Sequence, residues 1–131
     1  MLSINDHFCQ VGRLFYAIAI CDGKLHPSEM LNLKDGLNAY NQYLRNTYHT
    51  TIYTASFYIE DVLSTIVDEG LDSWAYFGKF KDYFEQHRDE FTDEQKDLIL
   101  SKVKEIGSSY AKQNKSELVL IARTNLLFKS D

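Results

Sequence analysis

Hydrophobic residues recur every three or four positions along most of the chain, which is the pattern of amphipathic α-helices. The clearest case predicts a helix from about Asn5 or Asp6 to Cys21. Its apolar face consists of Phe8, Val11, Leu14, Phe15, Ile18 and Ala19. The pattern stops at Gly23, because glycine readily takes the left-handed conformation that ends a helix.

A second helix is predicted to begin at Pro27, since proline suits the first helical position, where its missing N–H costs nothing. Glu29 then falls at the third position, from which its carboxylate can reach back to the N–H of His26. Gly36 interrupts the following pattern. We expect the helix to continue through it, because one glycine costs only ~1 kcal/mol.

The segment from residue 40 to residue 58 is rich in tyrosine and is the hardest to assign. We expect a loop from about Asn46 to Thr54. The tyrosines could form a surface for self-association or for a partner, since this side chain gives a large contact area at a small entropic cost. The favoured interpretation is that the rings cover the core while their hydroxyls face water.

Four further helices are predicted in the rest of the chain. They run from about Ala55 to Glu69, ended by Gly70, from about Asp72 to His87, from Thr92 to Gly107, and over the last apolar stretch to Phe128. Trp74, Phe77, Phe80 and Phe84 form one stripe, which we expect to be core. Residues 118–128 are apolar nearly all round, which predicts a helix buried on several sides.

These elements predict an all-α fold, a compact bundle of about six helices in a single domain spanning residues 1–131. The composition agrees, with 44% hydrophobic residues, one proline and six glycines in 131 residues. A core of ordinary size can therefore be buried, and few positions break helices.

The corner between the first two helices resembles a known family. Residues 19–29 read AICDGKLHPSE, which is similar to the A-x-A-D-G-x-I-x-x-x-E signature of TerB-like domains, the tellurite-resistance-protein-B family. Asp22, Gly23, Leu25 and Glu29 match that signature, and Cys21 replaces its usual small residue. The resemblance implies a helical domain with two pseudo-symmetric halves. It also implies that the acidic motif residues bind metal ions or mediate contacts in stress-response complexes.

The second half of the chain resembles the family's second acidic corner, with Glu117 in the place of the motif glutamate. Its Asp-Gly pair is absent, and residues 111–114 read AKQN instead. The candidate metal ligands are therefore Asp22, Glu29 and Glu117, and a divalent cation is the cofactor to test. The competing interpretation is that Asp22 and Glu29 tie the second helix to the end of the first. The residues favour this structural role.

Several function classes have no support in the sequence. The net charge of −5 argues against a nucleic-acid partner, because phosphate binding needs a basic surface. No stretch approaches the ~20 apolar residues of a membrane span, and no secretion signal is predicted. Cys9 and Cys21 lie about 18 Å apart on one helix, too far to pair, so reduced thiols in a cytoplasmic protein are expected.

No nucleophile, zinc or phosphate-binding motif is present in the sequence. We therefore expect a non-catalytic domain, and the resemblance to TerB-like domains implies a protein-interaction role in stress or tellurite-resistance-type responses. The alternative is a metal-binding or metal-sensing domain that uses the acidic corner. The sequence leaves the oligomeric state open.

Overall fold

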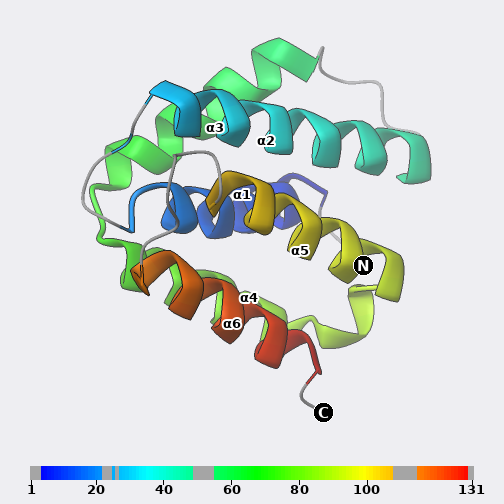
Figure 1. Cartoon of the computed structure of the whole chain (residues 1–131). Coiled ribbons are helices and arrows are strands. Elements are labelled where there is room, and N and C mark those ends of the chain that lie inside the picture. Colours follow the sequence, from blue (N-terminus) through cyan, green and yellow to red (C-terminus); the bar gives the residue numbers. More distant parts are fainter. Residues whose placement is uncertain (1–3, 22–24, 26, 49–54, 108–114, 130–131) are drawn as a thin grey trace.

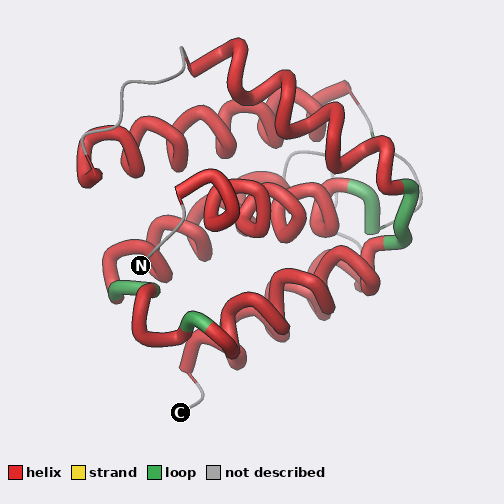
Figure 2. The backbone as a smooth tube through the Cα atoms, turned by 180° about the vertical axis from the view of Figure 1, so that it is seen from behind, coloured by secondary structure: helices red, strands yellow, loops and turns green. Residues whose placement is uncertain are grey.

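The computed structural model of the chain describes residues 4–21, 25, 27–48, 55–107 and 115–129. Within these residues the structure is helical and contains no strand (Figure 2), which confirms the predicted all-α fold of about six helices. The helices are α1 (Ile4–Ala19), α2 (Pro27–Tyr48), α3 (Ala55–Glu69), α4 (Ser73–Gln86), the 3₁₀ turn η1 (Arg88–Glu90), α5 (Asp93–Gly107) and α6 (Lys115–Lys129).

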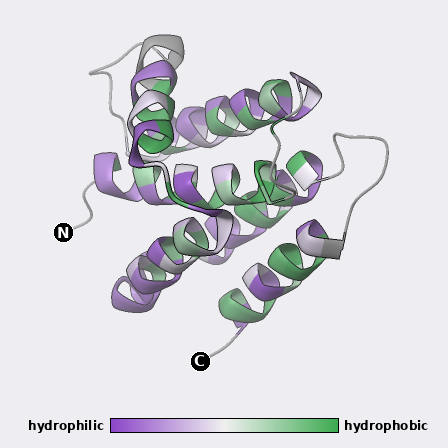
Figure 3. Cartoon of the chain, turned by 90° about the vertical axis from the view of Figure 1, so that its left-hand side faces the viewer, coloured by the Kyte–Doolittle hydropathy of each residue, from purple (hydrophilic) through white to green (hydrophobic). Residues whose placement is uncertain are grey.

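Helix α1 lies at the centre of the molecule, with α2 and α3 on one side of it and α4 and α6 on the other (Figure 1). It contacts each of the other five α-helices. Nine of its sixteen residues are buried, so the apolar face predicted from the sequence is the core of the fold. Figure 3 shows hydrophobic segments recurring on every helix, as expected of amphipathic helices that share one core.

Helix α2 runs without a break through Gly36, as predicted. Gly36 serves close packing here, because a Cβ at this position would lie 3.4 Å from Ile106 Cδ1 of α5 and 3.7 Å from Phe15 of α1. The helix also extends to Tyr48, so the expected loop start at Asn46 is wrong by three residues. Helix α1 ends at Ala19, two residues before the predicted end.

The predicted helix boundaries in the second half are confirmed by their hydrogen bonds. Gly70 follows α3 with a φ of 66°, in the left-handed region that favours glycine. Asp72 caps α4 by accepting a hydrogen bond of 2.8 Å from the Ala75 N–H. Thr92 and Gln95 form a reciprocal capping box before α5, with bonds of 3.1 and 3.2 Å.

Two expectations about burial are wrong. Trp74 was expected in the core with the other aromatics of its stripe, but 49% of its surface is exposed, while Phe77, Phe80 and Phe84 are buried. Helix α6 was expected to be buried on several sides, but Leu118 and Leu126 are 51% and 64% exposed. Among the described helices, α5, α1 and α4 cover only one side of α6, and nothing packs on its outer face.

Candidate functional site

The acidic corner predicted from the sequence is described in part. Asp22 lies outside the described residues, as does His26. Glu29 and Glu117 are each the third residue of their helix, after Pro27-Ser28 in α2 and after Lys115-Ser116 in α6. Their side chains are only 1% and 2% exposed. Two glutamates in the same helical position, both buried, are what two pseudo-symmetric corners would give.

The helices that carry the two glutamates begin on the same side of the molecule. Figure 1 shows the end of α1 and the starts of α2 and α6 on one side of the molecule. Glu117 Oε2 and Ile18 Cγ2 lie 3.5 and 3.6 Å from the point where a Cβ on Gly107 would stand, so Glu117 packs where α5 and α1 end. Within the described part of the chain, no three His, Cys, Asp or Glu side chains come together as a metal site.

A buried histidine is a feature that the sequence analysis missed. His7 of α1 is fully buried, and its Nε2 lies 2.5 Å from the hydroxyl of Tyr40 on α2. The histidine ring stacks on Tyr40 with 5.7 Å between centroids and lies 4.6 Å from the ring of Phe91. Its Nδ1 has no hydrogen-bond partner among the described residues. This environment requires the neutral imidazole.

Burial, together with a smaller contribution from the charge of His87, lowers the pKa of His7 from 6.5 to about 4. Burial likewise raises the pKa of Tyr40. The hydroxyl of Tyr40 therefore faces the core, which contradicts the expectation that the tyrosine hydroxyls face water. A periodic signal for His7 was available, because His7 precedes Val11, Leu14 and Ile18 at helical spacing.

Of the other four tyrosines of the 40–58 segment, two have a described side chain and two do not. Tyr43 is partly buried, and Tyr48 is 38% exposed with its hydroxyl 3.0 Å from Nε2 of Gln95. Tyr53 lies outside the described residues, and Tyr58 lies in α3 without a described side chain. The described tyrosines join α2 to α1 and α5, so they contribute to the packing of the bundle.

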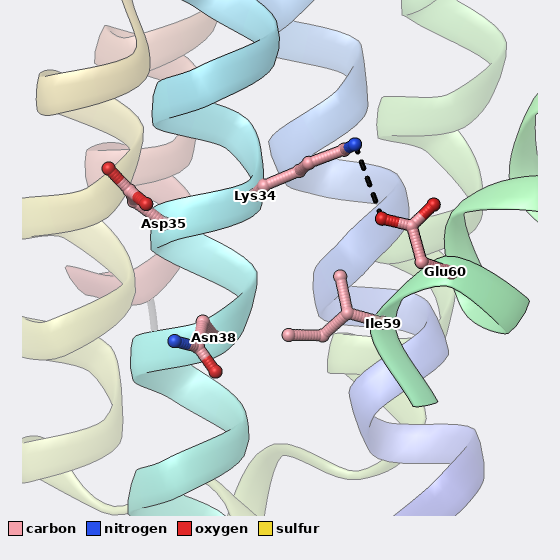
Figure 4. Close-up of a pocket in the computed structure, with 5 residues that line it drawn as sticks. All are labelled: Lys34, Asp35, Asn38, Ile59 and Glu60. Atoms are coloured by element: carbon pink, nitrogen blue, oxygen red, sulfur yellow. Dashed lines mark ion pairs between the residues drawn. The ribbon is translucent and has the colours of Figure 1, made fainter. Parts of the chain in front are cut away.

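A hollow of about 180 Å³ lies between α2 and α3, lined by Lys34, Asp35, Asn38, Ile59 and Glu60. Figure 4 shows Lys34 and Glu60 pointing toward one another, and their charged atoms lie 3.2 Å apart. Both side chains are well exposed, so the pair contributes little to stability. Four of the five lining residues are polar or charged and the cation is already paired, which leaves little for a ligand to bind.

A larger groove of about 270 Å³ lies between α4 and α6. Phe77, Lys81 and Glu85 of α4 line it together with Arg123, Leu126 and Leu127 of α6. The two helices run side by side in the same direction, since Arg123 in the middle of α6 lies over Trp74 at the start of α4 and the rings of Phe84 and Phe128 meet near the ends of both helices. Buried Phe77 and Leu127 form the floor of this groove, and Leu126 stands on its rim.

Three large apolar side chains of these two helices are exposed, namely Trp74, Leu118 and Leu126. We call the surface made by these three residues and Arg123 the α4–α6 face. Leu118 and Leu126 are eight residues apart and share the outer side of α6. The guanidinium of Arg123 lies 5.9 Å from the centroid of the Trp74 ring, a cation–π contact. Large apolar side chains held open beside a groove are typical of a binding surface.

The chain has no match among models of protein families, among curated proteins or among solved structures. The likeness to TerB-like domains therefore rests on its motif residues. None of the described helices combines the length and the apolar composition that crossing a bilayer requires. Cys9 and Cys21 are not joined in a disulfide, as the sequence predicted, and both are partly buried.

Proposed function

We propose that the chain is a non-catalytic interaction domain that binds another protein through the α4–α6 face. The observation that carries this proposal is the exposure of Trp74, Leu118 and Leu126 on the two helices that line an apolar groove. Exposing such side chains to water opposes stability in the free protein, and a bound partner removes that cost. The TerB-like motif suggests that such contacts occur in stress or tellurite-resistance-type assemblies.

A photo-cross-linking amino acid placed on the surface tests this function in the cells that make the protein. It replaces Leu118 or Leu126 on the α4–α6 face, and Leu31 on α2 serves as the matched control. Leu31 is 62% exposed and Leu126 is 64% exposed, so the two substitutions disturb folding equally little. We expect one discrete protein adduct from position 118 or 126 and none from position 31.

The outcomes of this experiment separate the function from the position of the surface. Discrete adducts at position 31 alone would support an interaction domain whose binding surface lies on α2 and not on the α4–α6 face. No adduct at any of the three positions, with the folded protein present in the cell, would contradict an interaction domain.

The second candidate function is a divalent-cation site formed by Asp22, Glu29 and Glu117. The burial of Glu29 and Glu117 supports it, because a buried carboxylate needs compensation that a cation can supply. The same burial also suits a structural role, in which each glutamate interacts with the positive end of its own helix. The two roles differ in how stability responds to added cations.

Thermal melts with Mg²⁺, Ca²⁺, Mn²⁺, Zn²⁺ or chelator distinguish the two roles. In the structural role, Glu29→Gln costs a few tenths to ~1 kcal/mol of unfolding free energy, the size of a cap or helix-dipole contribution, and cations change nothing. In the metal role, a cation raises the Tm of the wild type by mass action, and Asp22→Ala and Glu29→Gln both remove that rise. We predict the first result, and a cation-dependent rise lost in both variants would establish the second.

A further inference from the structure

We propose that the groove between α4 and α6 binds an amphipathic helix with an apolar face and acidic flanks. This inference rests on the proposed function and names the partner chemistry of the same face. It combines three observations, namely the shape of the groove, its apolar floor and the sign of the charge on its rim.

The shape of the groove suits a helix. The residues that line the groove span positions 77–85 of α4 and 123–127 of α6, so it runs for roughly 12 Å, a little over two helical turns. A helix laid between two parallel helices inserts the side chains that it carries at three- and four-residue spacing. The floor made by Phe77 and Leu127 and the rim at Leu126 would receive aliphatic side chains, and Trp74 contacts the lining residues Phe77 and Arg123.

The charge on the rim determines the flanks of the partner. Lys81 is already paired with Glu85 at 3.4 Å, and Lys79 points to Glu69 at 3.6 Å. Arg123 has its cation–π contact with Trp74, and no carboxylate of the described residues lies at ion-pair distance from it. The rim therefore offers one uncompensated cation to a partner.

The sequence of α6 strengthens this argument. The helix carries three basic residues and a single acid, Glu117, which is buried. A chain with a net charge of −5 thus has a helix of basic sequence beside the groove. Acidic flanks complement that helix, whereas two copies meeting through α6 would bring like charges together. The observations therefore favour a partner helix over a second copy of this chain.

The test uses two synthetic helical peptides of about four turns, each with leucines along one face. One peptide carries glutamates on its flanks and the other carries lysines, and neither contains tryptophan. Trp74 is the only tryptophan of the chain, so its fluorescence reports directly on the groove. We expect the glutamate peptide to shift Trp74 emission to shorter wavelength in a saturable way, and to bind more tightly than the lysine peptide.

Three variants assign the binding to the groove. Leu126→Asp is expected to weaken binding of the glutamate peptide about tenfold or more, because it places a carboxylate on the apolar rim. The matched control Leu31→Asp, at an equally exposed leucine of α2, is expected to leave binding unchanged. Arg123→Glu is expected to reverse the preference in favour of the lysine peptide. Circular dichroism of each variant confirms that it is folded.

Several results would overturn the inference. One is the absence of a saturable change with the glutamate peptide, and another is tighter binding of the lysine peptide by the wild type. Equal losses in Leu126→Asp and Leu31→Asp would also contradict it. Sedimentation that shows a dimer abolished by Leu126→Asp would assign the face to a second copy. None of these results decides whether the protein is an interaction domain, which the cross-linking experiment tests separately.

Discussion

Two glycines show how strongly the local backbone decides the effect of a single residue. A Cβ added at Gly70 or at Gly78 would meet nothing within 4 Å, so neither position is sterically crowded. Gly70 has a φ of 66° and ends α3, while Gly78 lies inside α4. The same substitution should therefore have opposite effects at the two positions.

Gly70→Ala is predicted to lower the free energy of unfolding by about 1–2 kcal/mol, since a side chain disfavours the left-handed backbone. Gly78→Ala is predicted to raise it by roughly 0.5–1 kcal/mol, because alanine has the higher helix propensity. Urea denaturation of both variants measures the two effects. A destabilised Gly78→Ala or a neutral Gly70→Ala would contradict this account of the two positions.

His7 shows the same dependence on surroundings for a titratable residue. In the folded protein its pKa is about 4, below the ordinary value of 6.5, because the buried ring resists protonation. Above pH 6.5 the ring is neutral in both the folded and the unfolded chain. As the pH falls from 6.5 toward 4, the unfolded chain binds the proton first, so this contribution to stability is progressively lost.

The unfolding free energy is therefore predicted to fall by up to about 3 kcal/mol between pH 6.5 and pH 4 on account of His7. Carboxylates titrate in part of the same range, so the difference between wild type and His7→Gln isolates the histidine. The variant should be less stable at pH 7 and show a flatter pH dependence. Parallel pH curves for the two proteins would show that His7 is not buried as a neutral ring.

At the scale of the helices, the signals that could be predicted from sequence are local ones. The spacing of apolar residues identified every helix, and Gly70, Asp72 and the Thr92–Gln95 box marked boundaries that the structure confirms. The role of Gly36 could not be predicted in the same way. Its close approach to α5 and α1 depends on residues about seventy positions later and twenty positions earlier in the chain.

The close packing around Gly36 limits the size of the side chain that α2 tolerates at this position. Gly36→Ala should change stability by less than ~1 kcal/mol, since its Cβ makes ordinary contacts at 3.4–3.7 Å and alanine favours a helix. Gly36→Leu should cost about 1–3 kcal/mol or more, because its further carbons overlap Ile106, Lys102 and Phe15. Thermal melts compare the two variants, and equal stabilities would contradict close packing of α2 against α5.

At the scale of the whole molecule, the sequence predicted the core better than the candidate binding surface. Phe77, Phe80 and Phe84 are buried because α1 and α6 cover their side of α4, and periodicity alone indicates such a face. Trp74 and Leu126 are equally apolar but open to water, because no described element packs over them. The sequence pattern shows which side chains are apolar, and the arrangement of the helices determines which of these apolar side chains are buried.

The acidic corner, unlike the α4–α6 face, was identified from the sequence. Its residues were singled out from a motif, and the structure adds that Glu29 and Glu117 hold the same helical position and are both buried. Thermal melts with added cations and with chelator determine whether these glutamates bind a cation. The α4–α6 face carries the proposed function independently of that answer, since the two regions share no residue.

Quenching of Trp74 fluorescence tests most directly whether the α4–α6 face is open and locally basic. Because Trp74 is half exposed beside Arg123, small ions should quench it readily. Relative to a free tryptophan derivative, anionic iodide should quench it more effectively than cationic caesium despite the net charge of −5. Arg123→Ala should reduce that preference. A Trp74 shielded from both ions, or quenched preferentially by caesium, would contradict the account.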